Sequence, residues 1–407
     1  MQRVRMSLPF YKEMGWEAEV ICVDEHYTDG FTDELLSETI PADIPVHKVK
    51  ALPLRYTRKF GLGSLSIRSY YHFKQKGTEL LEKKKFDLVF FSTTMFHVIA
   101  LGRYWKEKFG VPFVVDMQDP WRNDFYLSRP KSVRPPKFKM AYTIHKKMEA
   151  YTMPHADGII SVSKGYISEL QRRYPVLTSI PSVVIPFGLA ENDFVFTRRK
   201  QVAPEVITAT KDKINVVYIG ALLRQAFIPM LRALFTALKT HVADIDQYHF
   251  YFIGTSYATG TQEKIVEELA DELGIPQLVT EIPERISYFS ALATLMHADI
   301  LLIPGSVDKD YNASKVYNNV FAGKPVFCMF HEKSLVFDFI RKTNAGIAVG
   351  LNEDDNEVSM LAKIEDVMPG FQTLHLLKPD VIKTEIDKYS AFNMTAQQVD
   401  LFNKVVS

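Results

Sequence analysis

The sequence is poor in cysteine, has no long apolar run and carries almost no net charge. Its two cysteines, Cys22 and Cys328, lie far apart and form no CxxC pair, which argues against a disulfide framework and against a thiolate zinc site. The most apolar stretch, residues 86–105, contains Asp87 and several other polar residues, so it lacks the roughly 20 uninterrupted apolar residues of a membrane span. The first ten residues have no apolar core of a secretory signal. We therefore expect a protein of the reducing cytoplasm.

What the chain has instead is the composition of an ordinary globular protein. It contains 407 residues, 47% of them hydrophobic and 24% charged, which suits two packed cores and excludes disorder and coiled coil. The net charge of +1 conceals an asymmetry between the halves. Residues 1–200 hold 31 Lys and Arg against 22 Asp and Glu, whereas the remaining residues hold 18 against 26. This change of sign indicates a domain boundary near residue 200 and a first half that meets something anionic.

The basic residues of the first half are concentrated in two stretches. Residues 48–85 contain 11 Lys and Arg but only two acids, interleaved with Leu, Tyr and Phe, and a second basic stretch covers residues 131–147. A solvated surface explains such a pattern, and so does a surface that meets an anionic membrane or a diphosphate-bearing acceptor. Nucleic acid is the least favoured partner, and we predict none.

Short runs rich in Val, Ile and Phe alternate with longer amphipathic stretches, which is typical of parallel strands joined by helices. In the first half, the expected strands are residues 18–23, 87–92, 112–116, 158–162 and 183–186. In the second half, they are residues 215–220, 248–254, 278–282, 300–304, 325–330 and 346–349. We therefore predict an α/β protein with two open parallel sheets in tandem. Ligands of such sheets bind at the carboxyl ends of the strands, so the site is expected in a cleft between the two domains.

Residues 190–213 are polar and lack periodicity, so we take them as a linker between a first domain, residues 1–195, and a second, residues 212–385. The start of the chain is unusual, because residues 2–14 have the pattern of a helix and the first strand candidate would be the second strand of a doubly wound sheet. We expect the opening strand to be missing. Either the numbering begins at an internal methionine of a longer protein, or this domain has an unusual edge.

The first candidate for a phosphate site follows the strand at residues 215–220. Gly220 permits a turn and a close approach of the backbone, and Arg224 follows just before an expected helix at residues 227–238. A helix start offers free amide donors, and a guanidinium matches phosphate oxygens, so this arrangement suits a diphosphate. An exposed arginine near a helix end is the alternative interpretation.

The second candidate lies in the segment after the strand at residues 300–304. A polar loop leads to Ser314 and Lys315, which open a helix. Ser314 is expected to cap that helix, so that its amides point at the site, and Lys315 would add a charge for a leaving phosphate. An ordinary capped helix with a solvated lysine is the alternative.

Several segments resemble, in the same order along the chain, the motifs of family 4 glycosyltransferases of the GT-B fold. The segment ASKVYNNVFAGKPV at residues 313–326 is similar to that family's SKLFEYLAAGKPV, and VVYIGALLR at residues 216–224 is similar to its donor-phosphate strand and loop. Further similar segments are VVDMQDPW at 114–121, HADGIISVSKGY at 155–166 and VIPFGLAENDF at 184–194. The resemblance covers about residues 2–405.

The resemblance implies two Rossmann-like domains and a C-terminal helix, within residues 386–407, that returns to the first domain. It implies a hexosyltransferase of polysaccharide biosynthesis that moves a sugar from a nucleotide diphosphate donor, held by the second domain, to a polysaccharide or lipid-linked glycan acceptor, held by the first. By analogy, the reaction retains the anomeric configuration and needs no metal or other cofactor. Arg224 and Lys315 would stabilise the departing diphosphate. Such an enzyme of the cell envelope would work in the cytoplasm, peripherally at the inner face of the membrane.

Two positions of the expected donor site depart from the family pattern. The family commonly has two glutamates separated by seven residues, and the matching positions here are Asp310 and Asn318, where Asn binds a ribose diol without charge assistance. The family also pairs its loop arginine with a nearby lysine. Apolar residues follow Arg224 instead, so Lys315 would serve alone.

The acceptor side is expected to include Asp116, Gln118 and Arg122. Gln118 stands where many relatives carry a cleft histidine, and a glutamine cannot act as a base. We therefore expect Asp119 to orient or deprotonate the acceptor hydroxyl, although it could instead cap the segment after Pro120. Arg122 is a candidate contact for an acceptor phosphate.

The chain contains no P-loop, GxSxG, HExxH or dinucleotide fingerprint. Asp308 and Asp310 resemble the DxD that carries manganese in the other glycosyltransferase fold, but the tandem α/β pattern favours the metal-free fold, and we predict no metal site. Two other functions stay open. One is a catalytically impaired nucleotide-sugar-binding protein, and the other is a nucleotide-sugar epimerase of the same architecture.

Overall fold

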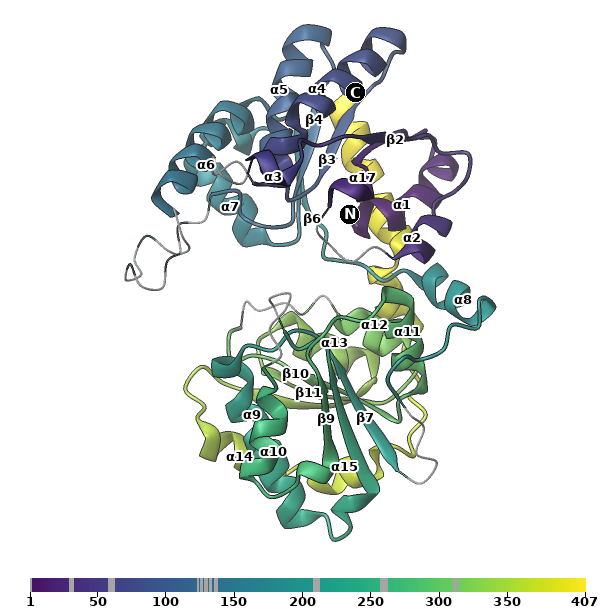
Figure 1. Cartoon of the computed structure of the whole chain (residues 1–407), viewed down its shortest axis with the longest axis vertical. Coiled ribbons are helices and arrows are strands. Elements are labelled where there is room, and N and C mark those ends of the chain that lie inside the picture. Colours follow the sequence, from purple (N-terminus) through teal and green to yellow (C-terminus); the bar gives the residue numbers. More distant parts are fainter. Residues whose placement is uncertain are drawn as a thin grey trace. The chain divides into compact units, whose positions relative to one another are not determined.

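The computed structural model of the chain divides into two compact units (Figure 1). It describes residues 2–28, 33–57, 63–122, 124, 127, 131, 134, 138–207, 213–256, 263–309, 313 and 315–407. Unit 1 comprises residues 1–188 together with 391–407, and unit 2 comprises residues 189–390. Each unit contains its own parallel sheets and its own hydrophobic core, which confirms the predicted α/β class.

Unit 1 contains two separate parallel sheets. A two-stranded sheet pairs β1 with β2, and a four-stranded sheet has the order β3-β4-β5-β6. The strands are β1 (Val20–Val23), β2 (Val46–Val49), β3 (Val89–Ser92), β4 (Phe113–Met117), β5 (Gly158–Ser161) and β6 (Ser182–Val184). The helices are α1 (Gln2–Tyr11), α2 (Glu34–Glu38), α3 (Leu54–Thr57), α4 (Leu65–Lys83), α5 (Phe96–Phe109), α6 (Phe138–Thr152), α7 (Lys164–Arg173) and α17 (Ala391–Val406).

The first described element is α1, as the sequence predicts, and β1 is the first strand. Among the described strands, none joins β1 to β3, so the two sheets of unit 1 stay unconnected. All four residues of β1 are only half-buried, although they are apolar. The short strand β2 was not predicted, because its sequence alternates and its first three residues are exposed or half-buried at a sheet edge.

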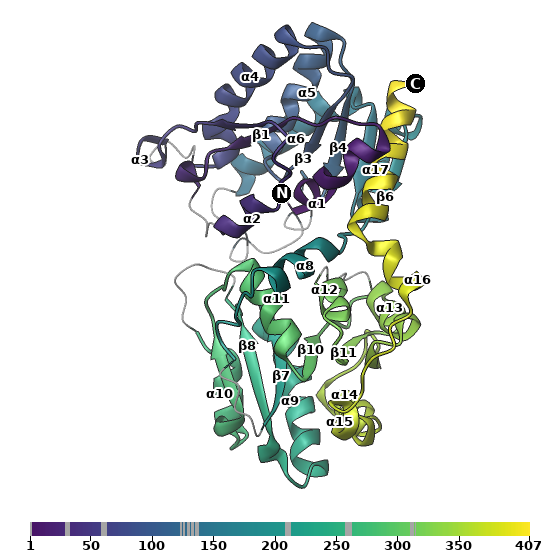
Figure 2. The same cartoon turned by 90° about the vertical axis from the view of Figure 1, so that its right-hand side faces the viewer.

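The C-terminal helix α17 packs within unit 1 (Figure 2). It lies against α1 and contacts β5 and β6. The hydroxyl of Tyr11 donates to Gln398 over 2.9 Å, and the indole of Trp16 donates to Asn403 over 3.0 Å. The close approach requires Gly158, since a Cβ there would lie 2.9 Å from side-chain atoms of α17.

Unit 2 is built on one six-stranded parallel sheet with the order β12-β11-β10-β7-β8-β9. The strands are β7 (Ile214–Ile219), β8 (Tyr248–Ile253), β9 (Val279–Ile282), β10 (Ile300–Pro304), β11 (Val326–His331) and β12 (Gly346–Leu351). The helices are α8 (Glu191–Arg199), α9 (Arg224–His241), α10 (Ile265–Glu272), α11 (Tyr288–His297), α12 (Val316–Phe321), α13 (Leu335–Thr343), α14 (Glu357–Glu365), α15 (Met368–Leu374) and α16 (Lys383–Ile386).

Helices cover the sheet of unit 2 on both faces, which is the doubly wound arrangement predicted from the sequence (Figures 1 and 2). Apolar side chains of α9, α10, α14 and α15 form one core with alternate residues of the strands. On the other side, α11 contacts β7, and α13 contacts β11 and β12. Among the described helices, none has the length and hydropathy that a membrane crossing requires.

The predicted linker at residues 190–213 is corrected by the structure, because its first part is the helix α8. Phe194 and Phe196 are buried there, and the ring of Phe196 lies 4.8 Å from that of Phe289 on α11. This aromatic contact makes α8 part of unit 2. The first domain therefore ends at Gly188 and not at residue 195, and the C-terminal return begins at Ala391 and not at residue 386.

Candidate functional site

The carboxyl ends of β7 and β8 in unit 2 continue into neighbouring turns, each with a glycine. The amide of Gly220 donates to the carbonyl of Ile253 over 2.8 Å, and the amide of Gly254 donates to that of Ile282 over 2.7 Å. Gly254 has φ +71°, a conformation that favours glycine. A Cβ on Gly220 would clash with the ammonium of Lys315, so the missing side chain leaves room for this cation.

Lys315 therefore lies against Gly220, and the structure brings together two of the residues predicted for the donor site. Lys315 is exposed as a whole residue, but its ammonium lies against the backbone of Gly220. Loss of water, and to a smaller extent the charge of Arg285, lowers the pKa of Lys315 to about 8. The carbonyl of Lys315 accepts a bond of 2.8 Å from the side chain of Asn319, which fixes the backbone at this point.

The sequence pattern placed Arg224 before the helix. In the structure, Arg224 is instead the first residue of α9. Its guanidinium bonds to Glu263 and to Glu268, each over 2.7 Å, and the residue is 47% exposed as a side chain. These two carboxylates raise the pKa of Arg224. The charge of this predicted phosphate ligand is thus compensated by two acids.

The remaining donor-site predictions concern the loop and helix before β11. Asp310 and Ser314 lie outside the described residues. The N-cap position of α12 is occupied by Lys315, which makes no side-chain capping bond. With six residues, α12 is also too short to supply a strong dipole. Asn318 is half-buried in this helix, and its side-chain amide makes no hydrogen bond within the described part of the chain.

In unit 1, Asp116 and Gln118 lie at the carboxyl end of β4, but Asp116 is buried. Its Oδ2 lies 2.9 Å from Nε of Arg3 in an ion pair, and it accepts hydrogen bonds from Ser92 over 2.7 Å and from Gln118 over 2.7 Å. Gln118 also donates to Ser92. Asp116 is only 1% exposed. Instead of offering an open carboxylate to an acceptor, Asp116 holds α1, β3 and Gln118 together.

Asp119 follows on the same loop and is more accessible than Asp116. Partial burial raises the pKa of the Asp119 carboxyl, which makes it a stronger base than a fully solvated aspartate. The predicted capping role is not seen, since no helix begins at residues 120–122.

Arg122 belongs to a network of ion pairs. It bonds to Asp124 over 2.9 Å and to the hydroxyl of Tyr142 over 2.8 Å. Its amide donates to Glu149, a buried carboxylate that also pairs with Arg173. Arg122 would have to leave these partners to bind an acceptor phosphate.

Sequence reasoning missed a buried histidine near the start of α5. Nδ1 of His97 lies 2.7 Å from the hydroxyl of Ser66, and its ring lies 5.1 Å from the ring of His145. Burial, with a smaller effect of His145, lowers the pKa of His97 to about 4, so this imidazole is neutral at pH 7. No sequence signal singles it out, since Ser66 lies 31 residues away in the chain.

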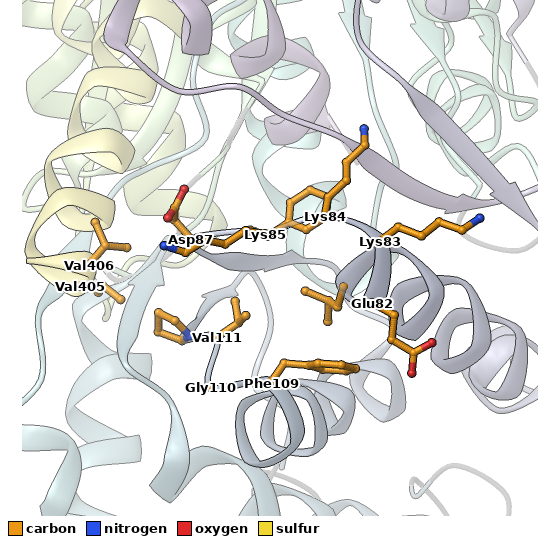
Figure 3. A pocket seen from close by; sticks show the side chains of 13 residues that line it. Glu82, Lys83, Lys84, Lys85, Asp87, Phe109, Gly110, Val111, Val405 and Val406 are labelled. Carbon is orange, nitrogen blue, oxygen red and sulfur yellow. The ribbon is translucent and has the colours of Figure 1, made fainter.

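A hollow of about 570 Å³ lies elsewhere in unit 1, at the amino ends of β3 and β4 (Figure 3). Lys83, Lys84 and Lys85 line it together with Phe109 and Val405. Lys83 bonds to Glu79, and Lys84 bonds to Glu19. The carboxyl ends of the strands, where ligands of parallel sheets bind, lie at the other edge of this sheet.

Asp24, Glu25 and His26 place potential metal-ligating atoms within 4.8 Å of one another on the surface of unit 1. Internal contacts account for this cluster. Asp24 accepts from the amide and from the ring of His26, and Glu25 pairs with Lys48 over 2.8 Å.

Comparisons with known proteins show which family and which solved structures this chain resembles. Residues 3–188 match the family model described as glycosyl transferase 4-like domain. A search of curated proteins found no match. Solved structures with a similar fold include sucrose-phosphate synthase from Thermosynechococcus elongatus, with 14% identity and a TM-score of 0.58 over 98% of this chain and 91% of the other.

Two further similar structures cover most of both chains. HepE from Anabaena in complex with UDP has 13% identity and a TM-score of 0.59, over 98% of this chain and 94% of the other. The UDP-forming α,α-trehalose-phosphate synthase from Burkholderia xenovorans, in complex with glucose-6-phosphate, has 9% identity and a TM-score of 0.60, over 99% and 96%. These matches confirm the expected resemblance and the expected fold. Residues 3–188 match the glycosyl transferase 4-like domain, and the chain as a whole has the fold of the GT-B glycosyltransferases.

Proposed function

We propose that this chain transfers a sugar from a nucleoside diphosphate sugar, bound by unit 2, to a polysaccharide or lipid-linked glycan acceptor, bound by unit 1. The observation that carries the proposal is Lys315, a cation without a counter-ion in the described structure, held against Gly220 where β7 ends. The similar structures named above include a complex with UDP, so a UDP-sugar is the first donor to test.

The chemistry of the proposed reaction needs positive charge on the leaving group. When the bond between the sugar and the diphosphate breaks, negative charge grows on the diphosphate while the sugar becomes oxocarbenium-like. A lysine with a lowered pKa is poorly hydrated, so an arriving anion displaces little water from it. We propose that the transfer retains the anomeric configuration. We also propose that it needs no metal ion, since Lys315 supplies the positive charge that a metal ion would otherwise provide.

On the acceptor side, Asp119 is our candidate for the group that receives or orients the hydroxyl proton. Its raised pKa and its accessibility support this role. The side chain of Gln118 donates hydrogen bonds to Asp116 and to Ser92, and these bonds stabilise the loop that carries Asp119. Arg122 is a secondary candidate for the acceptor, because Asp124 and Tyr142 already bind its guanidinium.

We further propose a place in surface polysaccharide assembly, with unit 1 attached peripherally to the inner face of the membrane. Unit 1 contains 29 Lys and Arg against 21 Asp and Glu, whereas unit 2 contains 20 against 27. Positive charge on the acceptor-binding unit favours an anionic surface or a lipid diphosphate.

One alternative is a binding protein that has lost turnover. Two observations favour it: the charge of Arg224 is compensated by Glu263 and Glu268, and Gln118 replaces a potential base and is locked by Asp116. An epimerase of the same architecture would convert the donor without any acceptor.

The test is release of nucleoside diphosphate from UDP-glucose, UDP-N-acetylglucosamine, GDP-mannose and ADP-glucose, with and without EDTA. The enzyme hypothesis predicts slow hydrolysis of at least one donor, unchanged by EDTA and reduced at least tenfold in Lys315→Gln. Lys342→Gln on α13 is the matched control. Conversion of a donor into its epimer would favour the epimerase, and binding without any release would favour the impaired protein.

A further inference from the structure

A second cation without a counter-ion in the described part of the chain lies near Lys315, and no sequence motif indicates it. Arg285 belongs to the loop that follows β9. Its Cα would lie 3.9 Å, and its Cγ 4.0 Å, from a Cβ placed on Gly254. Arg285 thus lies against the glycine turn after β8, as Lys315 lies against the glycine turn after β7. Since β7 and β8 are neighbours, the two cations lie over adjacent turns of one sheet edge.

Neither cation is compensated within the described residues. Arg285 is exposed and makes no hydrogen bond or ion pair there, and the same holds for the ammonium of Lys315. The two charges lie close enough for Arg285 to lower the pKa of Lys315. Two like charges that interact without a neighbouring acid cost free energy, and a bound dianion would remove that cost.

The surrounding backbone also favours an anion at this place. The helix α9 begins four residues after Gly220, and its N-cap Leu223 provides no side-chain bond to the first amides. With 18 residues, α9 directs the positive end of a full helix dipole to the side of the sheet where Lys315 and Arg285 lie. Arg224, by contrast, is held by two carboxylates.

We propose that Arg285, together with Lys315, binds the diphosphate of the nucleotide donor, and that Arg285 supplies the second cation that the sequence lacks after Arg224. This inference rests on the proposed function, since it assigns the phosphate-binding residue of the same site. A guanidinium gives two parallel bonds to phosphate oxygens, and an ammonium adds a point charge. Arg285 is therefore a donor-binding residue that determines affinity for the phosphates and not for the base.

Calorimetry on the full chain tests this assignment, with UDP, uridine and inorganic pyrophosphate as probes. The Arg285→Gln variant should bind UDP and pyrophosphate about 10-fold to 100-fold more weakly than the wild type, whereas its affinity for uridine stays the same. Arg285→Lys keeps the positive charge but loses the two parallel N–H donors of the guanidinium, so its affinity for UDP and pyrophosphate should lie between those of the wild type and Arg285→Gln. The matched control is Arg341→Gln, an exposed arginine on α13, which should bind all three probes like the wild type.

The outcomes separate this inference from the proposed function. If Arg285→Gln binds UDP and pyrophosphate as tightly as the wild type, Arg285 is not a phosphate ligand, while transfer by the wild-type enzyme would leave the function intact. An equal loss of uridine affinity would show a structural role and would also overturn the assignment. If the wild type binds pyrophosphate through Arg285 but releases diphosphate from no donor, the anion site stands and the transferase function falls. If the wild type binds neither UDP nor pyrophosphate, the anion site itself is refuted.

Discussion

The contact between Lys315 and Gly220 shows how one missing side chain determines the charge of a site. Without a Cβ at residue 220, the ammonium can lie over the turn, where little water reaches it. This desolvation, and then the charge of Arg285, lowers the pKa of Lys315 to about 8. The lysine is therefore charged at pH 7 but loses its proton at a pH where a solvated lysine, with a pKa of about 10.4, would keep it.

Nucleotide binding by this site should depend on pH. UDP affinity should fall about tenfold between about pH 7 and pH 9, because Lys315 loses its charge as the pH rises through its pKa. Calorimetry across this range measures it. The Lys315→Arg variant stays charged and should give a flat profile, and a flat profile in the wild type would contradict the assignment.

At the residue scale, the sequence predicts what is local and misses what the sheet brings together. Gly220 and Lys315 were identified because a glycine after a strand and a lysine before a helix are recognisable in the chain. The acids that bind Arg224 are 39 and 44 residues away from it, and the charge of Arg285 reaches Lys315 only because the strands that precede them belong to one sheet with the order β10-β7-β8-β9. Such partners depend on strand order, which no local pattern contains.

Among the elements, α17 makes a dense aromatic contact with the rest of unit 1. The ring of Phe402 lies 5.0 Å from Phe90 on β3, 5.4 Å from Trp16 and 6.2 Å from Tyr11 on α1. Phe402 is buried, and Gln398 one turn earlier bonds to both Tyr11 and Ser7. The C-terminal helix is therefore part of the core of unit 1.

The second prediction concerns this helix. Phe402→Ala should lower the free energy of unfolding of unit 1 by about 3 to 5 kcal/mol, because it removes a buried ring and leaves a cavity. All three tryptophans of the chain, at positions 16, 105 and 121, belong to unit 1, so tryptophan fluorescence in urea follows this unit alone. Lys404→Ala, exposed on the same helix, should change the value by less than about 0.5 kcal/mol. Equal effects of both variants would refute the packing argument.

Helices and strands could be predicted where a single pattern of apolar residues runs through the whole segment. The strands of unit 2 are continuous apolar runs because the sheet is covered on both faces, and each expected run contains a strand. The elements missed are short and half-exposed. β2 has one buried residue among four, and the buried rings of α8, Phe194 and Phe196, are only two residues apart, so neither element shows a clear period of its own type.

For the whole molecule, the order of motifs along the chain predicted the fold, whereas the division into units depends on contacts between residues distant in sequence. Residues 391–407 belong with residues 1–188, and this follows from the packing of α17 on α1. The charge asymmetry seen in the sequence persists with the corrected boundaries. Unit 1 is the basic one.

A candidate surface for the membrane lies on α6 of unit 1. Met140, Ile144 and Tyr151 are exposed by 52%, 40% and 45%, and they recur with Lys147 on one side of the helix. Lys139 and Lys146 are exposed beside them. An amphipathic helix with apolar residues and lysines on its outer side is the type that lies in the interface of an anionic membrane.

The third prediction is that the chain sediments with phosphatidylcholine vesicles that contain phosphatidylglycerol, and not with phosphatidylcholine alone. Each lysine near an anionic surface contributes about 1 kcal/mol, so the double variant Lys146→Glu, Lys147→Glu should weaken binding by at least about 25-fold. Lys333→Glu with Lys378→Glu changes the net charge equally but on unit 2, and should bind like the wild type. If both double variants lose binding equally, total charge and not α6 drives attachment. If the wild type sediments equally with both kinds of vesicle, anionic lipid plays no part, and the basic side chains of unit 1 would instead serve the acceptor.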